Sequence, residues 1–320
     1  MPFSAPEIYQ EYEEDKYKPT AEKKAAEALR YAQEQRTKNR ELLGEISPAE
    51  AHELFKEEYF GPEAVEAAFD VRLEDHSIPP IPFTLEELQK AKELGQYLEL
   101  RVNQDPDGSP LTGKRINEII QPKLTAQNKG KLLLDTDRYK DEPFYTTDAQ
   151  REPSWALTSK ECLTNSKNQN YLQQSELLVS HLQEKILPNI PEGDPRHEIY
   201  TDALQEWEEF TKTKKPEIEA VFKDEARYNA EWPEIAKTLG NLKINQLLRP
   251  SFQEALYSHA LRVTTTDTRL HKTDYVWTRD RASSGYLVDV GYGDSDGAYV
   301  GRWYPRYADP DTGVAVSRSA

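Results

Sequence analysis

The side chains best suited to chemistry are concentrated in the final stretch of the sequence, from Asp274 to Ala320. This stretch is rich in tyrosine, serine, aspartate, arginine and glycine. After Lys272 the chain contains no lysine, glutamate, glutamine, asparagine, methionine, histidine, phenylalanine or isoleucine. Tyrosine supplies rigid amphipathic contact area, serine and glycine supply adaptable hydrogen bonding, and arginine and aspartate supply charge. This set of residues favours non-covalent recognition of a ligand over catalysis.

The candidate ligand-binding residues are polar or aromatic positions in this stretch. They are Arg279, Asp280, Arg281, Tyr286, Asp289, Tyr292, Asp294, Tyr299, Arg302, Tyr304, Arg306 and Tyr307. Because successive strand residues point to opposite faces, they cannot all lie on one face, and some are expected to be framework or loop-tip residues. The apolar residues expected to hold the sheet together are Leu287, Val288, Val290, Val300, Trp303, Val314 and Val316.

Cysteine and histidine offer little sign of catalytic or metal chemistry. Cys162 is the only cysteine, which excludes an internal disulfide, a cysteine-based metal cluster and a redox pair; a lone thiol is typical of a small core residue. The histidines without metal-ligand spacing are His181, His197, His259 and His271. No nucleophile-elbow, phosphate-loop or dinucleotide-binding fingerprint is present. The sequence therefore predicts no enzyme, no metal site and no cofactor.

Two acidic segments could bind a cation but are interpreted as loops. Asp294-Ser295-Asp296-Gly297 begins with the spacing of a calcium-binding loop, yet Pro305 stands where the bidentate glutamate should be, so a hairpin turn is expected. The segment Asp135–Glu142 contains several carboxylates and is more typical of a solvated loop.

Four strands are expected to position the candidate residues. Their predicted bounds are Tyr275–Thr278, Tyr286–Tyr292, Ala298–Tyr304 and Val314–Ser317. The second and third are joined by a hairpin loop at Gly293–Gly297, and a turn is expected at Asp309–Gly313.

The upstream sequence predicts an irregular mixture of helices and short strands. Capping boxes at Ser47–Glu50 and Thr84–Glu87 each open a helix. A helix over Thr112–Ile120 is expected to stop at Pro122. The expected short strands are Tyr97–Val102, Lys131–Leu134, Phe144–Thr146 and Trp155–Thr158. Further helices are expected at Tyr171–Leu187, Ile199–Thr211, Glu217–Tyr228, Pro233–Leu239 and Phe252–Val263.

Composition narrows the classes of partner. The formal net charge is −16, which argues against nucleic acid because phosphate binding needs a basic face. No apolar run approaches the roughly 20 residues of a membrane span, and the N-terminus lacks the features of a secretory signal, so a cytoplasmic location is the default expectation. Thr20 caps a long polar helix, Ala21–Leu43, which would be a surface strut or half of an oligomer contact.

The terminal stretch resembles a known family. The residues that carry the resemblance are Trp277-Thr278, Ser283-Ser284-Gly285, Val288-Asp289-Val290, the glycine-rich hairpin, Trp303-x-Pro305 and Gly313-Val314-x-Val316-Ser317-Arg318. They are similar to the end of a C-type-lectin-like domain. The closest likeness is to the branch shared by formylglycine-generating enzymes and the variable proteins of diversity-generating retroelements. In the variable proteins, adenine substitution turns asparagine codons into Tyr, Ser, Asp, Gly, Arg and similar codons, but not into Lys, Glu, Gln, Met or Trp codons, so the two tryptophans of the stretch are expected to belong to the scaffold.

The resemblance implies an α+β fold. A C-type-lectin-like domain would cover residues 82–320, with a helical insertion at about 168–263 and a variable β region at about 274–320. It would follow an N-terminal helical region, residues 1–81. The implied function is hypervariable binding of a macromolecular ligand, most simply a protein, with oligomerisation possible through the N-terminal helices.

Three alternatives remain open. A tyrosine- and glycine-rich sheet is poor in lysine and glutamate without any diversification, because these are weak strand residues. An enzyme of the sulfatase-modifying-factor type would show a deep polar pocket with shifted titratable groups, although formylglycine chemistry needs two cysteines and the chain has one. A structural or assembly protein would bury Tyr286, Tyr304 and Tyr307.

Overall fold

The computed structural model describes residues 46–74 and 77–319. The compact unit containing them begins at Ile46. Apolar side chains between residues 46 and 81, such as Phe55, Val65 and Ile81, enter the same hydrophobic core as later segments. The expected helix Ala21–Leu43, with its cap Thr20, lies outside the described residues.

The described part is a mixed α+β structure with two four-stranded sheets. The first sheet has the order β1-β2-β3-β8, and its strands span Tyr59–Phe60, Gln96–Arg101, Ser154–Ser159 and Ser317–Ser319 respectively. β1 is parallel to β2, while the β2–β3 and β3–β8 pairs are antiparallel. The expected strands at residues 97–102 and 155–158 are therefore confirmed, as the centre of this sheet.

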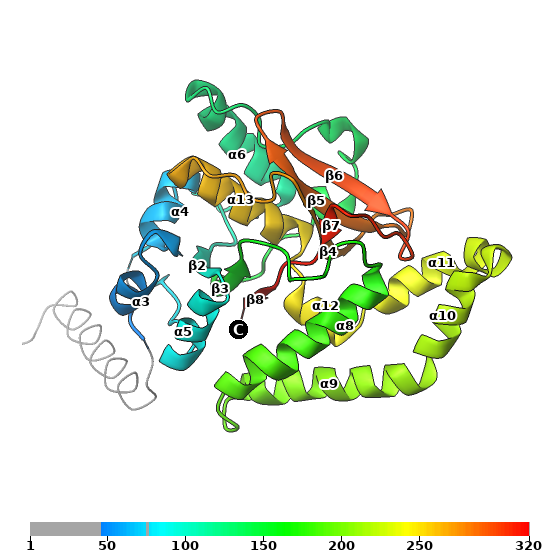
Figure 1. Ribbon diagram of the computed structural model, residues 1–320. Helices are drawn as coiled ribbons and strands as arrows, with labels where there is room; N and C mark the ends of the chain where they lie inside the picture. The colour runs from blue at the N-terminus through cyan, green and yellow to red at the C-terminus, as the bar shows by residue number, and fades with distance from the viewer. Residues whose placement is uncertain (1–45, 75–76, 320) are drawn as a thin grey trace, which may run out of the picture. The chain divides into compact units, whose positions relative to one another are not determined.

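The second sheet has the order β6-β5-β4-β7 and carries most of the terminal stretch (Figure 1). β4 spans Tyr275–Arg281, β5 Leu287–Asp294, β6 Gly297–Trp303 and β7 Thr312–Gly313. The β4–β5 and β5–β6 pairs are antiparallel, and β7 is parallel to β4. The first three expected strands and the hairpin between β5 and β6 are confirmed.

The fourth expected strand, Val314–Ser317, is wrong as a single element. β7 ends at Gly313, residues 314–316 belong to neither sheet, and β8 begins at Ser317 in the other sheet. Leu163 N donates to Val314 O at 2.8 Å, and Ser159 N donates to Val316 O at 2.8 Å. These bonds to the end of β3 and the following loop, rather than to β4, draw the segment from one sheet to the other.

The helices that pack on the two sheets form the first core. These are α3 (Pro48–Phe55), α4 (Pro62–Phe69), α5 (Leu85–Glu93), α6 (Gly113–Ala126), α7 (Pro143–Thr146) and α13 (Phe252–Thr266). The expected capping boxes of α3 and α5 are both formed, by Ser47 with Glu50 and by Thr84 with Glu87. No helix among residues 46–74 and 77–319 is long and apolar enough to cross a membrane.

A separate helical group fills the region of the expected insertion. It comprises α8 (Tyr171–His181), α9 (Pro195–Thr213), α10 (Lys215–Lys223), α11 (Glu225–Gly240) and α12 (Lys243–Leu248), drawn green to yellow in Figure 1. Short helical turns lie at Lys56–Glu58, Thr136–Arg138, Leu182–Ile186 and Leu187–Asn189. The group forms a second core that also takes in Trp277 and Leu287. α13 packs in the first core, so in packing terms the insertion ends before it.

Three local expectations are corrected. α6 continues through Pro122 to Ala126, because Pro122 is exposed and the buried Leu124 holds the last turn in the core. Residues 144–146 form part of α7, not a strand, since Pro143 begins a helical turn and Phe144 packs against Phe252 at 5.0 Å between ring centroids. Residues 131–134 form only one isolated bridge, from Leu133 to Ala298.

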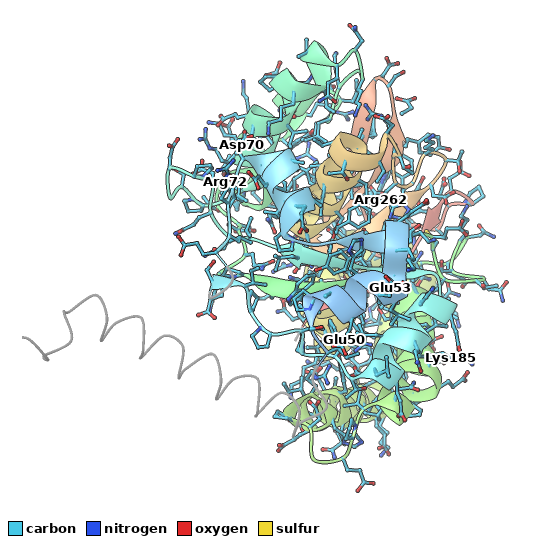
Figure 2. The ribbon with its side chains drawn as sticks, turned by 90° about the vertical axis from the view of Figure 1, so that its left-hand side faces the viewer. Glu50, Glu53, Asp70, Arg72, Lys185 and Arg262 are labelled. Atoms are coloured by element: carbon cyan, nitrogen blue, oxygen red, sulfur yellow. The ribbon has the colours of Figure 1, made fainter. Side chains whose placement is uncertain are left out.

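Charged side chains tie α13 to the first sheet. Arg262 of α13, labelled in Figure 2, forms an ion pair with Glu58 at 2.8 Å and lies 5.0 Å from the ring centroids of Phe60 and Tyr97. On the outer side of this region the labelled Glu53 and Arg72 are exposed. The cation is therefore enclosed by aromatic rings on the inner side, where it fixes α13 against β1 and β2.

Candidate ligand-binding surface

The inner face of the second sheet is an apolar framework. Val276, Val290 and Val300 are register neighbours on β4, β5 and β6; all three are buried, and Val290 and Val300 belong to the first core. Val288 lies on the same face and is fully buried. The alternation of strand residues then directs the intervening side chains to the opposite face.

That opposite face is only partly covered by helices. Trp277 and Leu287 are buried in the second core beneath the helical group. Tyr275 and Tyr299 lie on either side of Gly291, with ring centroids 6.1 Å apart. A side chain at Gly291 would come within 2.0 Å of the carbonyl oxygen of residue 274, so only glycine fits between the two tyrosines.

The Tyr275 cluster, defined as Tyr275, Tyr292 and Tyr299, is bordered by charge. The rings of Tyr275 and Tyr292 are 4.7 Å apart, and the Tyr292 hydroxyl donates to an Asp311 carboxylate oxygen at 2.7 Å. The Arg138 guanidinium donates to the Tyr299 hydroxyl and lies 5.7 Å from its ring centroid. The three tyrosines thus have fixed orientations while remaining partly exposed.

Trp303 is more exposed than the sequence suggested. It was expected in the sheet framework, but it ends β6 and is 39% exposed. Its ring stacks on Tyr307, with centroids 4.3 Å apart and planes 8° from parallel. The Tyr307 hydroxyl donates to Asp309 at 2.8 Å. Because β6 is an edge strand, the ring of Trp303 has no neighbouring strand on one side. It packs on Tyr307 from the following loop and is otherwise partly open to solvent.

The Trp232 cluster, defined as Trp232, Tyr286 and Tyr304, joins helix α11 to the sheet. The Trp232 ring is 4.6 Å from that of Tyr286 and 4.8 Å from that of Tyr304, and the two tyrosine hydroxyls are 3.1 Å apart. Tyr304 is 39% exposed and Tyr286 is partly exposed. Next to this cluster, the Arg306 guanidinium lies 3.8 Å from the Tyr228 ring centroid.

Other candidates are engaged by residues of the scaffold. Arg279 pairs with Glu254 at 2.9 Å, and Asp280 accepts a hydrogen bond from Phe252 N, so both brace the start of α13. Burial raises the pKa of the Asp280 carboxyl to about 6. Arg302 pairs with Glu142 at 2.8 Å. Arg279, Asp280 and Arg302 therefore stabilise the scaffold through contacts within the chain.

Two further candidates have different surroundings again. Arg281 is partly exposed near the end of β4. Asp294 is exposed in the hairpin turn, where it accepts a hydrogen bond from Asp296 N at 2.8 Å. This bond confirms the interpretation of the acidic segment as a hairpin turn.

Asp289 is the most unusual of the predicted site residues. It lies in the middle of β5 with no exposed surface, and within the described part of the chain neither carboxylate oxygen has a hydrogen-bond partner. Burial raises the pKa of this carboxyl to about 7. A Cβ on Gly301, its register neighbour, would lie 2.0 Å from one carboxylate oxygen and 2.8 Å from Nε1 of Trp303. The acid therefore occupies the space above Gly301, close to the Trp303 ring.

A cleft of about 690 Å³ with a mixed polar and apolar lining opens between the loop after β3 and α8. Cys162 and His181 are among its lining residues. Burial raises the pKa of the Cys162 thiol to about 12 and lowers the pKa of His181 to about 4. Both groups are therefore neutral near neutral pH, opposite to the thiolate–imidazolium pair of a cysteine nucleophile.

One group of side chains has the arrangement of metal ligands. Among residues 46–74 and 77–319, Cys162, His271 and Asp274 are the set whose ligand atoms all lie within 4.8 Å of one another. Sequence spacing could not reveal it, because Cys162 is far from the other two in the chain. In the acidic loop that could have bound a cation, Asp135 and Asp137 instead face Arg138 at 3.9 Å and Lys140 at 3.6 Å.

Sequence reasoning missed three aromatic contributors to the exposed surface. Tyr275 precedes the valine framework on β4, Trp303 was assigned to that framework, and Trp232 was not among the candidate ligand-binding residues. Alternation could have identified Tyr275, since Val276 next to it is buried. Nothing local to Trp232 indicates that α11 brings it beside β5 and β6.

Comparisons with known proteins do not identify this chain: no family model matches its sequence, and no match is found to a curated protein or a solved structure.

Proposed function

We propose that the protein is a ligand-binding protein whose contact surface is the outer face of the second sheet and the loops at its ends. The observation that carries this proposal is the pair of exposed rings at the end of β6, Trp303 and Tyr304, each 39% exposed. Aromatic residues of this kind supply most of the binding energy in protein interfaces. The Tyr275 cluster and the Trp232 cluster extend the surface from these rings.

The chemistry of the surface favours a ligand with cationic groups. Aromatic ring faces attract cations, and Asp309 and Asp311 accept hydrogen bonds from the surrounding tyrosines. Asp289 adds a buried acid without a counter-ion. A basic group of a partner protein placed over the exposed Trp303 ring would lie near this buried carboxyl without contacting it.

The same arrangement supports diversification of the surface by a retroelement, on a scaffold of the C-type-lectin-like type. The buried valines of the inner face hold the sheet, so partly exposed residues such as Tyr286 and Tyr304 could change without disturbing the core. An assembly protein would instead bury these tyrosines. Arg279, Asp280 and Arg302, which brace the scaffold, would then belong to the constant part.

Sequences of sibling copies of the gene test the diversification. Differences should be concentrated after Lys272, at exposed positions such as Tyr299 and Tyr304, and should spare Val288 and Val290. Differences spread evenly along the chain would contradict the proposal.

A matched pair of variants tests the surface itself. Tyr304→Ser should change the free energy of unfolding by about 1 kcal/mol, since the ring is partly solvated and loses its contacts with Trp232 and Tyr286 and an exposed hydroxyl–hydroxyl hydrogen bond. Val290→Ser, in the framework beneath, should cost about 3 kcal/mol because it puts a hydroxyl into the core. Equal losses in a urea titration would show that Tyr304 is part of the scaffold.

A further inference from the structure

A mixed sulfur, nitrogen and oxygen cluster lies where the second sheet meets the loop after β3. Cys162 comes from that loop, and His271 and Asp274 come from the segment just before β4. Thiolate, imidazole and carboxylate are the three ligand types that zinc accepts in proteins. We propose that Cys162, His271 and Asp274 together bind a zinc ion.

The spatial arrangement favours a metal over a nucleophilic relay. In a cysteine–histidine–aspartate relay the imidazole lies between the other two groups, and the carboxylate orients it through a hydrogen bond. Here the three ligand atoms lie within 4.8 Å of one another, as they would around one point. Nδ1 of His271 is buried and has no hydrogen-bond partner in the described part of the chain.

Backbone contacts hold the ligand-bearing segments in place. Leu163, next to the cysteine, donates its N–H to Val314 O at 2.8 Å. Gly293 N donates to the carbonyl of His271 at 3.1 Å, and Tyr292 N donates to the carbonyl of Asp274 at 3.0 Å. The loop after β3 is thus fixed to the segment leaving β7, and the histidine and aspartate are fixed to β5. A zinc ion would join segments already brought together by the fold.

Each ligand atom has a reason to accept the ion. The Cys162 sulfur makes only a long contact, 4.0 Å to the Tyr275 carbonyl oxygen. The Asp274 carboxylate is 18% exposed and pairs with Lys167, whose side chain is 42% exposed and can move into water. With one thiolate and one carboxylate, a Zn²⁺ site would carry no net charge, which limits the cost of burying it.

The coordination sphere has room for one further ligand. Zinc in proteins is usually four-coordinate, and sites with three protein ligands hold water in the fourth position. Within residues 46–74 and 77–319 no other histidine or acidic residue supplies a fourth ligand to the cluster. The site is therefore of the kind that accepts water or a small anionic or thiol ligand.

Cobalt substitution tests the proposal directly. The full-length protein, stripped of metal with a chelator, is titrated with Co²⁺ and then with Zn²⁺ in competition with a chromophoric chelator. We expect one equivalent of Co²⁺ to give a sulfur-to-cobalt charge-transfer band and the intense visible bands of tetrahedral cobalt, and Zn²⁺ to abolish both. Cys162→Ser should lose the charge-transfer band and weaken zinc binding by roughly a hundredfold.

Two further variants distinguish the loss of a zinc ligand from misfolding of the protein. Lys167→Ala removes the cation that competes for Asp274, so it should bind zinc more tightly than the wild type. His197→Ala, which changes a partly exposed histidine on α9, should bind zinc as the wild type does. The proposal is overturned if the wild type gives no charge-transfer band, or if Cys162→Ser and Lys167→Ala both bind zinc with wild-type affinity.

Discussion

The buried acid of β5 predicts an unusual dependence of stability on pH. The pKa of an aspartate carboxyl is 3.8 in its ordinary state and about 7 for Asp289 in the folded chain, because burial disfavours the charged form. Between these values the unfolded chain releases the proton freely while the folded chain retains it. The protonated Asp289 therefore makes its full contribution to the free energy of unfolding only below about pH 4, and this contribution is lost as the pH rises to about 7.

The magnitude follows from the size of the shift. A difference of about 3 pKa units at about 1.4 kcal/mol each gives about 4 kcal/mol lost near neutral pH. Asp289→Asn has nearly the shape of the protonated acid and cannot ionise. The variant should therefore become more stable than the wild type by about 1.4 kcal/mol per pH unit between about pH 4 and pH 7, with a constant difference above that range.

Urea unfolding followed by tryptophan fluorescence, repeated from about pH 4.5 to pH 8.5, measures this difference. Groups that titrate in both proteins, such as His181 and His259, cancel in the comparison. Asp294→Asn serves as the control, because this aspartate is exposed in the hairpin turn and its substitution should give a flat difference. A difference for Asp289→Asn that stays constant within about 0.5 kcal/mol across the range would refute the reasoning.

Three other substitutions probe the scaffold beneath the surface, each read by chemical unfolding. Gly301→Ala should lower the free energy of unfolding by about 3 kcal/mol or more, because the added methyl group would lie 2.0 Å from the Asp289 carboxylate. The control is Gly193→Ala, which should be neutral because no atom lies within 4 Å of the added methyl group. Equal losses of stability in the two variants would contradict this prediction. Arg249→Ala should lower the free energy of unfolding by about 3–5 kcal/mol, because the buried guanidinium donates hydrogen bonds to the side chains of Gln174 on α8 and Asn245 on α12 and to the carbonyl of Tyr171. A loss under about 1 kcal/mol would show that these acceptors find other hydrogen-bond donors. Glu142→Gln should cost about 1–2 kcal/mol by weakening the 2.8 Å pair with Arg302, and the loss should shrink at high salt if the pair is responsible.

Sequence patterns predicted the elements whose signals are local. The capping boxes at Ser47 and Thr84 formed because a side chain and a backbone N–H three residues apart satisfy each other without help from the rest of the fold. β5 was predicted because the buried Val288 and Val290 alternate along it, and β4 because Tyr275–Thr278 is a run of aromatic and β-branched residues. The helix over residues 112–120 was cut short, because the proline rule takes no account of a buried residue beyond it.

The candidate site was less predictable, because exposure depends on distant neighbours. Asp289 and Tyr286 look alike in the sequence as polar positions of one strand, yet one is fully buried and the other partly exposed. The difference arises from Gly301 and Trp303 on the adjacent strand, which no local pattern links to Asp289. The cysteine, histidine and aspartate cluster is hidden for the same reason, since its members meet only when the loop after β3 reaches β4.

The passage of the chain from β7 to β8 has a consequence for the order of assembly. β8 completes the first sheet beside β3, about 160 residues upstream, a closure that is slow compared with local pairing. Until it docks, the buried Glu87 carboxylate lacks Arg318 and the buried Arg101 lacks Ser317. Without β8, Glu87 keeps its ion pair with Arg196 and Arg101 keeps those with Glu99 and Glu254, so the buried charges are paired before β8 docks and its arrival completes their hydrogen bonding.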